Sequence, residues 1–241
     1  MGRSMLCLAS SCLRRQQKET VMRLRIQRAV LLLPMAVLGV SLSTPAVSQN
    51  AMSFFLTSAN PGQGADLGGL AGADAYCEKL AAAVNAGGKN WRAYLSATAS
   101  GGSPAVNARD RIGRGPWHNA KGALVAASVD ELHGTNMLNK QTALTEKGEV
   151  ISGRGDPVNM HDILTGSAPD GRVAMASGDT TCGNWSQSGA GSAVVGHHDR
   201  MGLDDSAPAK SWNASHGTRG CGMDALKATG GAGLFYCFAA N

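Results

Sequence analysis

The chain has 241 residues, with 22 Lys and Arg against 17 Asp and Glu, and a net charge of +5. Seven of the basic residues and one acidic residue precede Gln49, so residues 49–241 carry 15 basic and 16 acidic residues, a net of −1. This balance argues against a nucleic-acid or polyanion binder, because such proteins carry a clustered positive excess.

The start of the chain has the pattern of an export signal. From Met22, three arginines precede the apolar run Ala29–Leu42, and Ala46-Val47-Ser48 has the small-x-small form of a signal peptidase site. The run is shorter than the roughly 20 residues of a membrane span, although an uncleaved anchor is the alternative. We expect a secreted or periplasmic bacterial protein that lies outside the membrane after cleavage. We expect residues 1–21 to precede the true start at Met22, residues 22–48 to be the signal peptide and residues 49–241 to form a single domain.

The first elements of this domain are well marked. Residues 53–62 are typical of a strand that ends in a Pro-Gly turn. Residues 65–88 have apolar side chains at spacings of three and four, which predicts a helix with Asp66 as N-cap, Cys77 on its apolar face and a Gly-Gly stop. Residues 90–98 alternate, which predicts a strand with Trp91, Ala93 and Leu95 on one face.

The pattern weakens between residues 100 and 180. We expect a short turn or helix after Asn107, a β-prone segment at 123–128 and a short helix from Val129. A hairpin is predicted around Lys147-Gly148, and a turn at 169–171. The last strand, at 231–241, alternates Leu234, Tyr236 and Phe238 and carries Cys237.

Four cysteines follow the leader, namely Cys77, Cys182, Cys221 and Cys237. An even number of cysteines in an exported protein predicts two disulfides, and the residues alone leave three pairings open. The cysteines are too far apart for a zinc-finger pattern, in which the ligands come in close pairs.

The order of these segments resembles the C-type-lectin-like fold in its endostatin-like branch, which comprises the collagen-derived endostatin domain and bacterial secreted or outer-surface relatives. The likeness covers roughly residues 53–239 and rests on "FFLTSANPGQGADLGGLAGADAYC", "WRAYLS", and "LTGSAPDGR" followed by "CGNW". It implies an α+β domain of mixed, mainly antiparallel strands with one or two helices and long loops. It also implies nested disulfides, Cys77–Cys237 and Cys182–Cys221.

His197-His198-Asp199 and His161-Asp162 could offer ligands to zinc. Adjacent residues on a strand point to opposite faces, so two neighbouring histidines rarely bind one ion. No HExxH spacing is present. We therefore expect no metal or cofactor, with one histidine packed inward and the other facing solvent or bonding the backbone. A zinc-dependent enzyme using His161, His197 and His198 is an alternative.

A calcium-dependent carbohydrate-binding lectin is a second alternative that the resemblance suggests. Such lectins use oxygen-bearing tripeptides, and the nearest strings here are Ala168-Pro169-Asp170 and Trp212-Asn213-Ala214. Alanine stands where an oxygen ligand is needed, which argues against calcium-dependent binding.

Arg109, Arg111 and Arg114 form a small basic cluster. The resemblance implies heparan sulfate binding through surface arginines, but the net charge favours structural salt bridges. The RGD string at 154–156 is interpreted as a chance match.

No GxSxG elbow, P-loop or free cysteine nucleophile follows the leader. We expect a secreted, non-enzymatic binding module that recognises an extracellular protein or glycan through loops between about 100 and 215. Trp185 is expected to pack as an aromatic anchor. The candidate ligand-binding residues are Arg109, Arg111, Arg114, Trp185, His197, His198, Trp212 and Asn213.

Overall fold

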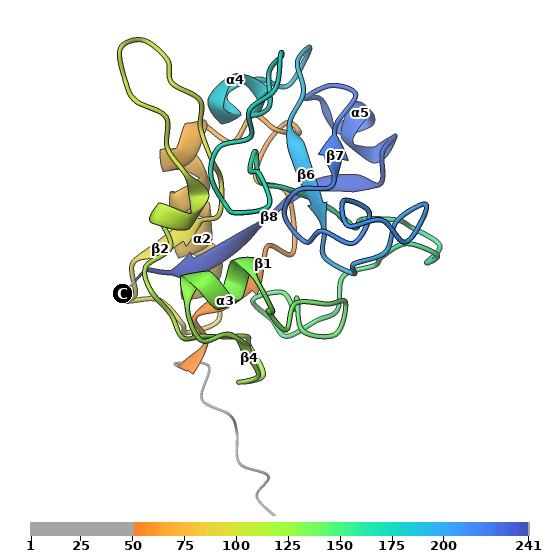
Figure 1. The fold of residues 1–241 in the computed structure, drawn as a ribbon. Helices are drawn as coiled ribbons and strands as arrows, with labels where there is room; N and C mark the ends of the chain where they lie inside the picture. Colours follow the sequence, from red (N-terminus) through yellow and green to blue (C-terminus); the bar gives the residue numbers. More distant parts are fainter. Residues whose placement is uncertain (1–50, 241) are drawn as a thin grey trace, which may run out of the picture. The chain divides into compact units, whose positions relative to one another are not determined.

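The fold is organised around one long strand, β8 (Gly231–Ala239), in a computed structural model that describes residues 51–240. The sheet has the order β1-β8-β5-β6-β7, and β2 also pairs with β8 (Figure 1). All pairings in it are antiparallel except β5 with β8. The molecule is therefore the α+β, antiparallel-rich type that was predicted. The expected start and signal peptide, 1–48, lie outside the described residues.

β8 lies between two hydrophobic clusters, because its successive side chains point to opposite faces of the sheet. Leu234, Tyr236 and Phe238 pack in one cluster, and Phe235 and Cys237 in the other. Successive side chains on a strand point to opposite faces, so a strand buried on both faces places apolar residues at nearly every position. The predicted alternation in this segment is confirmed.

The first helix, α2 (Gly69–Ala83), packs against the second cluster through Ala73, Cys77 and Ala81. Asp66 is not its N-cap, contrary to prediction. Its carboxylate accepts the Gly68 N–H two residues on, and no side chain caps the helix. Gly68 and Gly69 both have positive φ, 73° and 71°, so the chain enters the helix through a left-handed bend that glycine tolerates.

The other predicted elements are present but short. The 147–148 segment is a turn, with the Gly148 N–H donating to the Thr145 carbonyl, flanked by an isolated bridge rather than two strands. The Gly171 N–H donates to the Ala168 carbonyl, which confirms the turn there. The remaining elements are β1 (Phe54–Leu56), β2 (Trp91–Ala93), η2 (Ala108–Asp110), β3 (Trp117–His118), β4 (Leu124–Ala126), α3 (Val129–His133), β5 (Asp162–Leu164), α4 (Cys182–Trp185), β6 (Val194–His197), β7 (His216–Gly217) and α5 (Met223–Lys227).

The two disulfides are Cys77–Cys237 and Cys182–Cys221, so the nested pairing is confirmed. The first ties α2 to β8 across 160 residues of sequence, and the second closes 39 residues. Disulfides persist in oxidising compartments, which agrees with an exported protein.

The turn α4 is left-handed. Cys182, Gly183, Asn184 and Trp185 all have φ between 48° and 67°. The turn is held from outside, since the Asn184 amide exchanges hydrogen bonds with the Thr98 backbone. This geometry points the Trp185 ring into the core.

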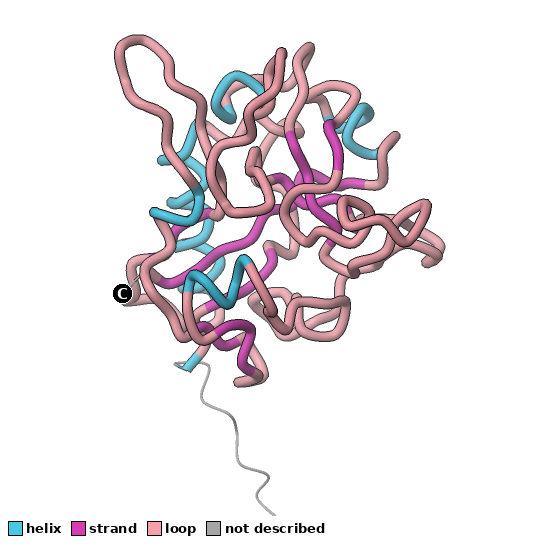
Figure 2. Tube along the Cα trace, viewed as in Figure 1, coloured by secondary structure: helices cyan, strands magenta, loops and turns pink. Residues whose placement is uncertain are grey.

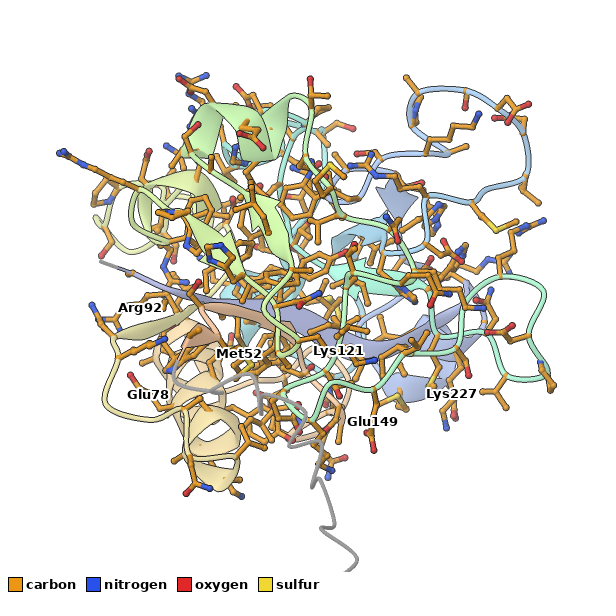
Figure 3. All side chains as sticks on the ribbon, turned by 90° about the horizontal axis from the view of Figure 1, so that it is seen from below. Met52, Glu78, Arg92, Lys121, Glu149 and Lys227 are labelled. Carbon is orange, nitrogen blue, oxygen red and sulfur yellow. A yellow bond between two sulfur atoms is a disulfide. The ribbon has the colours of Figure 1, made fainter. Side chains whose placement is uncertain are left out.

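Loops connect these elements over most of the traced chain (Figure 2). Side chains seen from below place Arg92 and Lys227 near opposite ends of β8 (Figure 3). Within residues 51–240, no helix combines the length and apolar character needed to cross a membrane.

Candidate metal centre

Neighbouring strands bring three polar side chains to one place on the sheet. Asp162 on β5 lies opposite His197 on β6, and His216 on β7 lies opposite Val195, two residues from His197. Directly paired residues and residues two apart share a face, so Asp162, His197 and His216 share one. β6 can approach the segment before β7 because residue 196 is glycine; a Cβ there would lie 2.0 Å from the Trp212 carbonyl oxygen.

Three imidazoles surround one carboxylate oxygen. The Nε2 atoms of His161, His197 and His216 lie 3.2, 3.3 and 3.4 Å from the Asp162 Oδ1 atom. The ligand atoms of His161, Asp162 and His197 all lie within 4.8 Å of one another. These three residues are buried, with exposed fractions of 2–4 %, whereas the His216 side chain is 38 % exposed.

The other ring nitrogen of each histidine contacts a group that can only accept a hydrogen bond. His161 Nδ1 lies 3.2 Å from an Asp199 carboxylate oxygen. His197 Nδ1 and His216 Nδ1 lie 2.7 and 3.2 Å from the carbonyl oxygens of Ala209 and Gly217. Each Nδ1 therefore carries the proton, and in the neutral ring Nε2 presents a lone pair. Outer partners of this kind orient histidines that bind metal.

Several atoms of the cluster have no hydrogen-bond partner in the described part of the chain. They are both carboxylate oxygens of Asp162 and Nε2 of His197. The His197 Nε2 and Asp162 Oδ1 atoms lie 3.3 Å apart, within ion-pair range. Buried polar atoms are nearly always satisfied, so a group of orphaned ones needs an explanation.

Asp199 positions His161. Besides His161, its carboxylate accepts the backbone N–H groups of Arg154 and Met201, at 2.7 and 3.0 Å. Burial raises the pKa of Asp199, but these hydrogen bonds outweigh it and hold the pKa well below its usual range. Burial likewise raises the pKa of Asp162, and this pKa falls below the ordinary value where His197 and His216 donate to the carboxylate from Nε2, a contact that in turn raises the pKa of His216. Both carboxylates are therefore ionised at neutral pH.

His198 is directed away from this cluster. Its Nε2 lies 3.4 Å from the Ser152 carbonyl oxygen, and burial lowers its pKa. His197 packs inward and His198 bonds the backbone, which agrees with the prediction, and neither ring faces solvent. The reason is that the 200–211 segment folds over the end of β6, with the His197 N–H donating to the Ser211 carbonyl.

A cavity of about 500 Å³ lies against the cluster. His161, His197 and His216 line it, together with Arg154, Arg219 and the 202–209 loop. The half-exposed His216 ring therefore lies between the buried ligand atoms and a space that a small molecule can enter.

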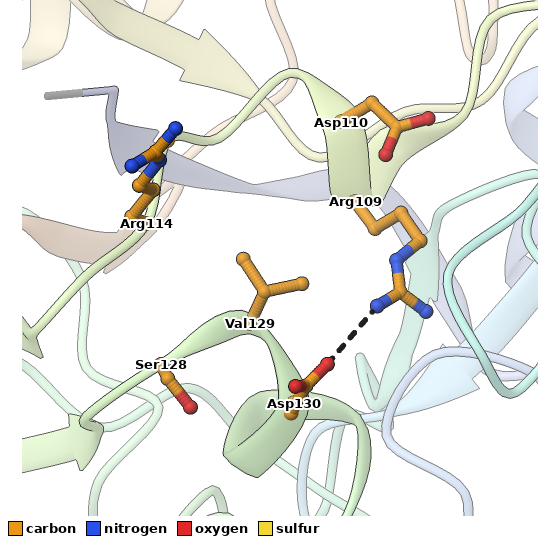
Figure 4. A pocket seen from close by; sticks show the side chains of 7 residues that line it. Arg109, Asp110, Arg114, Ser128, Val129 and Asp130 are labelled. Carbon is orange, nitrogen blue, oxygen red and sulfur yellow. Dashed lines mark hydrogen bonds and ion pairs between the residues drawn. The ribbon is translucent and has the colours of Figure 1, made fainter.

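The predicted basic cluster does not form a free cationic surface. Arg109 pairs with Asp130 at 3.3 Å, and Arg111 pairs with Asp74 at 2.7 Å. Both also donate to backbone carbonyls. Arg109 and Arg114 line a second cavity of about 500 Å³, where only Arg109 forms an ion pair among the residues drawn (Figure 4). Two of the three arginines thus have the structural role that the charge balance favours.

Three other candidate ligand residues belong to the core. Trp185 is fully buried and its Nε1–H donates to the Ser96 carbonyl at 2.7 Å. Trp212 packs between aromatic rings, and the Asn213 amide donates to the Tyr94 hydroxyl and two backbone carbonyls. Their exposed fractions of 0–4 % leave no surface for a ligand.

His216 was not singled out from the sequence. It lies alone in the polar segment 211–220, with no spacing that links it to another histidine. The only available signal is that it is one of six histidines, and the register of β6 against β7 supplies the rest.

No protein-family model matches this chain, and a search of curated proteins finds no matching sequence. The functional argument therefore rests on the geometry of the site.

Proposed function

We propose that this protein is an exported binding module that holds a zinc ion between His161, Asp162 and His197, with His216 as the fourth ligand. The observation that carries this proposal is the convergence of three imidazole Nε2 atoms on one buried carboxylate oxygen. If the rings are neutral, three lone pairs face an anion, and this arrangement is repulsive. A cation between them converts the repulsion into coordination.

The distances support zinc. Metal–ligand bonds of about 2.0 Å in a tetrahedral zinc site place neighbouring ligand atoms about 3.3 Å apart. The three Nε2–Oδ1 distances, which are three of the six edges of such a tetrahedron, are 3.2, 3.3 and 3.4 Å. Imidazole nitrogen suits zinc and other transition metals, whereas calcium and magnesium prefer oxygen.

The ligand set favours binding over hydrolysis. Catalytic zinc sites combine three protein ligands with a water molecule, whereas four side chains complete a tetrahedral site. The second buried carboxylate at this site, Asp199, already accepts hydrogen bonds from His161 and two backbone N–H groups, so it is poorly placed as a general base. We therefore retain the non-enzymatic role expected from the sequence, with the metal cavity as its recognition site for an extracellular protein or glycan group.

The two alternatives drawn from the sequence have less support. The zinc enzyme relied on His198, whose ring nitrogens take no part in the cluster. The calcium lectin relied on Asp170 and Asn213, but Asp170 pairs with Arg172 and Asn213 is buried.

We also propose that the fold belongs to the C-type-lectin-like, endostatin-like group. Three features support this: the nested disulfides, the link between α2 and the last strand, and the antiparallel pairing of β1 with β8 near the two ends of the domain.

The test is metal analysis of the purified protein after removal of loosely bound ions. We expect one zinc per chain, lost in His161→Ala and His197→Ala. His118→Ala is the matched control, since this histidine lies on β3 outside the cluster. A protein without stoichiometric zinc, or one whose zinc content is the same in all three variants, would refute the proposal.

A further inference from the structure

The cavity beside the proposed zinc site is lined by two arginines in addition to the proposed metal ligands. Arg154 and Arg219 both line it. The other charged lining residue is Asp204, which is exposed and whose carboxylate accepts the Ser206 N–H.

Neither of these arginines forms an ion pair in the 51–240 region. Arg92, Arg109, Arg111 and Arg172, by contrast, each lie within 4 Å of a carboxylate. Two lining arginines without an ion pair favour the binding of an anion, since arginine matches carboxylate and phosphate geometry with paired N–H donors.

One of the two arginines is tied to the metal centre by the backbone. The Arg154 N–H donates to the same Asp199 carboxylate that holds His161. Residue 153 is glycine, where a Cβ would lie 2.5 Å from the Asp199 Oδ2 atom. The loop therefore packs closely on Asp199, and this contact places residue 154 beside the ligands before any anion arrives. Preorganised contacts of this kind reduce the cost of binding.

We propose that the cavity binds a small anionic group, a carboxylate or a phosphate, next to the zinc ion and against Arg154 and Arg219. This inference rests on the proposed metal function. With zinc bound, the charges of the metal and the two arginines exceed those of Asp162, Asp199 and Asp204, so the site is positive overall. Its volume of about 500 Å³ is typical of a small-molecule pocket, which suits a free anion or the anionic end group of a larger ligand.

The experiment uses the protein loaded with cobalt(II), whose visible spectrum reports on the metal surroundings. Inorganic phosphate and acetate are titrated separately, with binding followed by the spectrum and by calorimetry. We expect saturable binding of at least one anion, and the comparison of the two identifies phosphate or carboxylate as the preferred group. The double variant Arg154→Ala/Arg219→Ala should retain one metal per chain and bind that anion at least tenfold more weakly.

Arg114→Ala is the matched control, because this exposed arginine lines a different cavity, and it should bind the anion as the wild type does. Normal metal content with no response to either anion overturns this inference and leaves the metal proposal intact. Equal anion affinity in the double variant also overturns it. A protein that takes up no cobalt overturns both.

Discussion

Asp162→Asn should change the stability of the protein in opposite directions with and without metal. Asp162 is 2 % exposed, and neither of its carboxylate oxygens has a hydrogen-bond partner within residues 51–240. A buried polar group left unsatisfied costs about 1–3 kcal/mol, and more when it is charged. Asparagine removes the charge and can donate from its amide to an Nε2 lone pair. We therefore expect the metal-free variant to be about 1–3 kcal/mol more stable than the wild type.

Zinc should reverse this order. A ligand that binds only the folded state stabilises it by about 4 kcal/mol when its free concentration is 1,000 times Kd. The variant lacks the only anionic ligand of the set, so at the same zinc concentration it should gain little. In zinc, the unfolding free energy of the wild type should then be about 1–3 kcal/mol higher than that of the variant, which is the zinc stabilisation minus the metal-free difference.

The assay is urea unfolding followed by circular dichroism, in chelator and in buffered zinc, at a pH near 7.5. Asp179→Asn serves as the control, because this exposed carboxylate caps backbone N–H groups away from the cluster; its effect should be the same in both conditions. If Asp162→Asn is destabilising to the same extent with and without zinc, the carboxylate is held by protonated imidazoles and the reasoning fails.

Three further predictions concern the scaffold. Replacing both Cys77 and Cys237 with alanine removes a disulfide that spans 160 residues. The chain-entropy treatment predicts that the unfolding free energy falls by about 5 kcal/mol. A loss under about 1 kcal/mol in urea unfolding would contradict this prediction. Trp185→Phe leaves the buried Ser96 carbonyl without its indole donor, so thermal or urea unfolding should show a loss of about 1–3 kcal/mol, and an unchanged midpoint would argue against the buried hydrogen bond. Burial lowers the pKa of His133, so the unfolded chain binds more protons and the stability falls as the pH drops below about 6.5. His133→Gln should reduce the fall in unfolding free energy between pH 7 and 5. An equally steep fall in this variant would exclude the contribution of His133.

Much of the scaffold could be predicted because its signals are local. The helix around Cys77 follows from apolar residues at spacings of three and four, and β8 follows from its apolar, aromatic-rich run through Phe238. Exposed turns such as the one at Gly171 follow from residue types that tolerate the required backbone angles. The N-cap at Asp66 was wrong because two consecutive glycines bend the chain before the helix begins.

The metal centre could be predicted only in part. The sequence indicated His161, Asp162 and His197 as candidate zinc ligands, but the rule that neighbouring histidines diverge argued against a shared ion. That rule is correct for His197 and His198. The histidine that joins His197 at the site is His216, which lies 19 residues after His197 in the sequence and is placed there by the pairing of β7 with β6.

Periodicity, turn chemistry and cysteine count determined the helix around Cys77, the last strand, the turn at Gly171 and the number of disulfides, because these signals do not depend on which segments pair. The tertiary structure alone decided which imidazoles share a carboxylate and which arginines beside them form no ion pair within residues 51–240. The physical reason is that a strand's own pattern sets which face each side chain occupies, whereas the register between strands sets which distant side chains meet on that face.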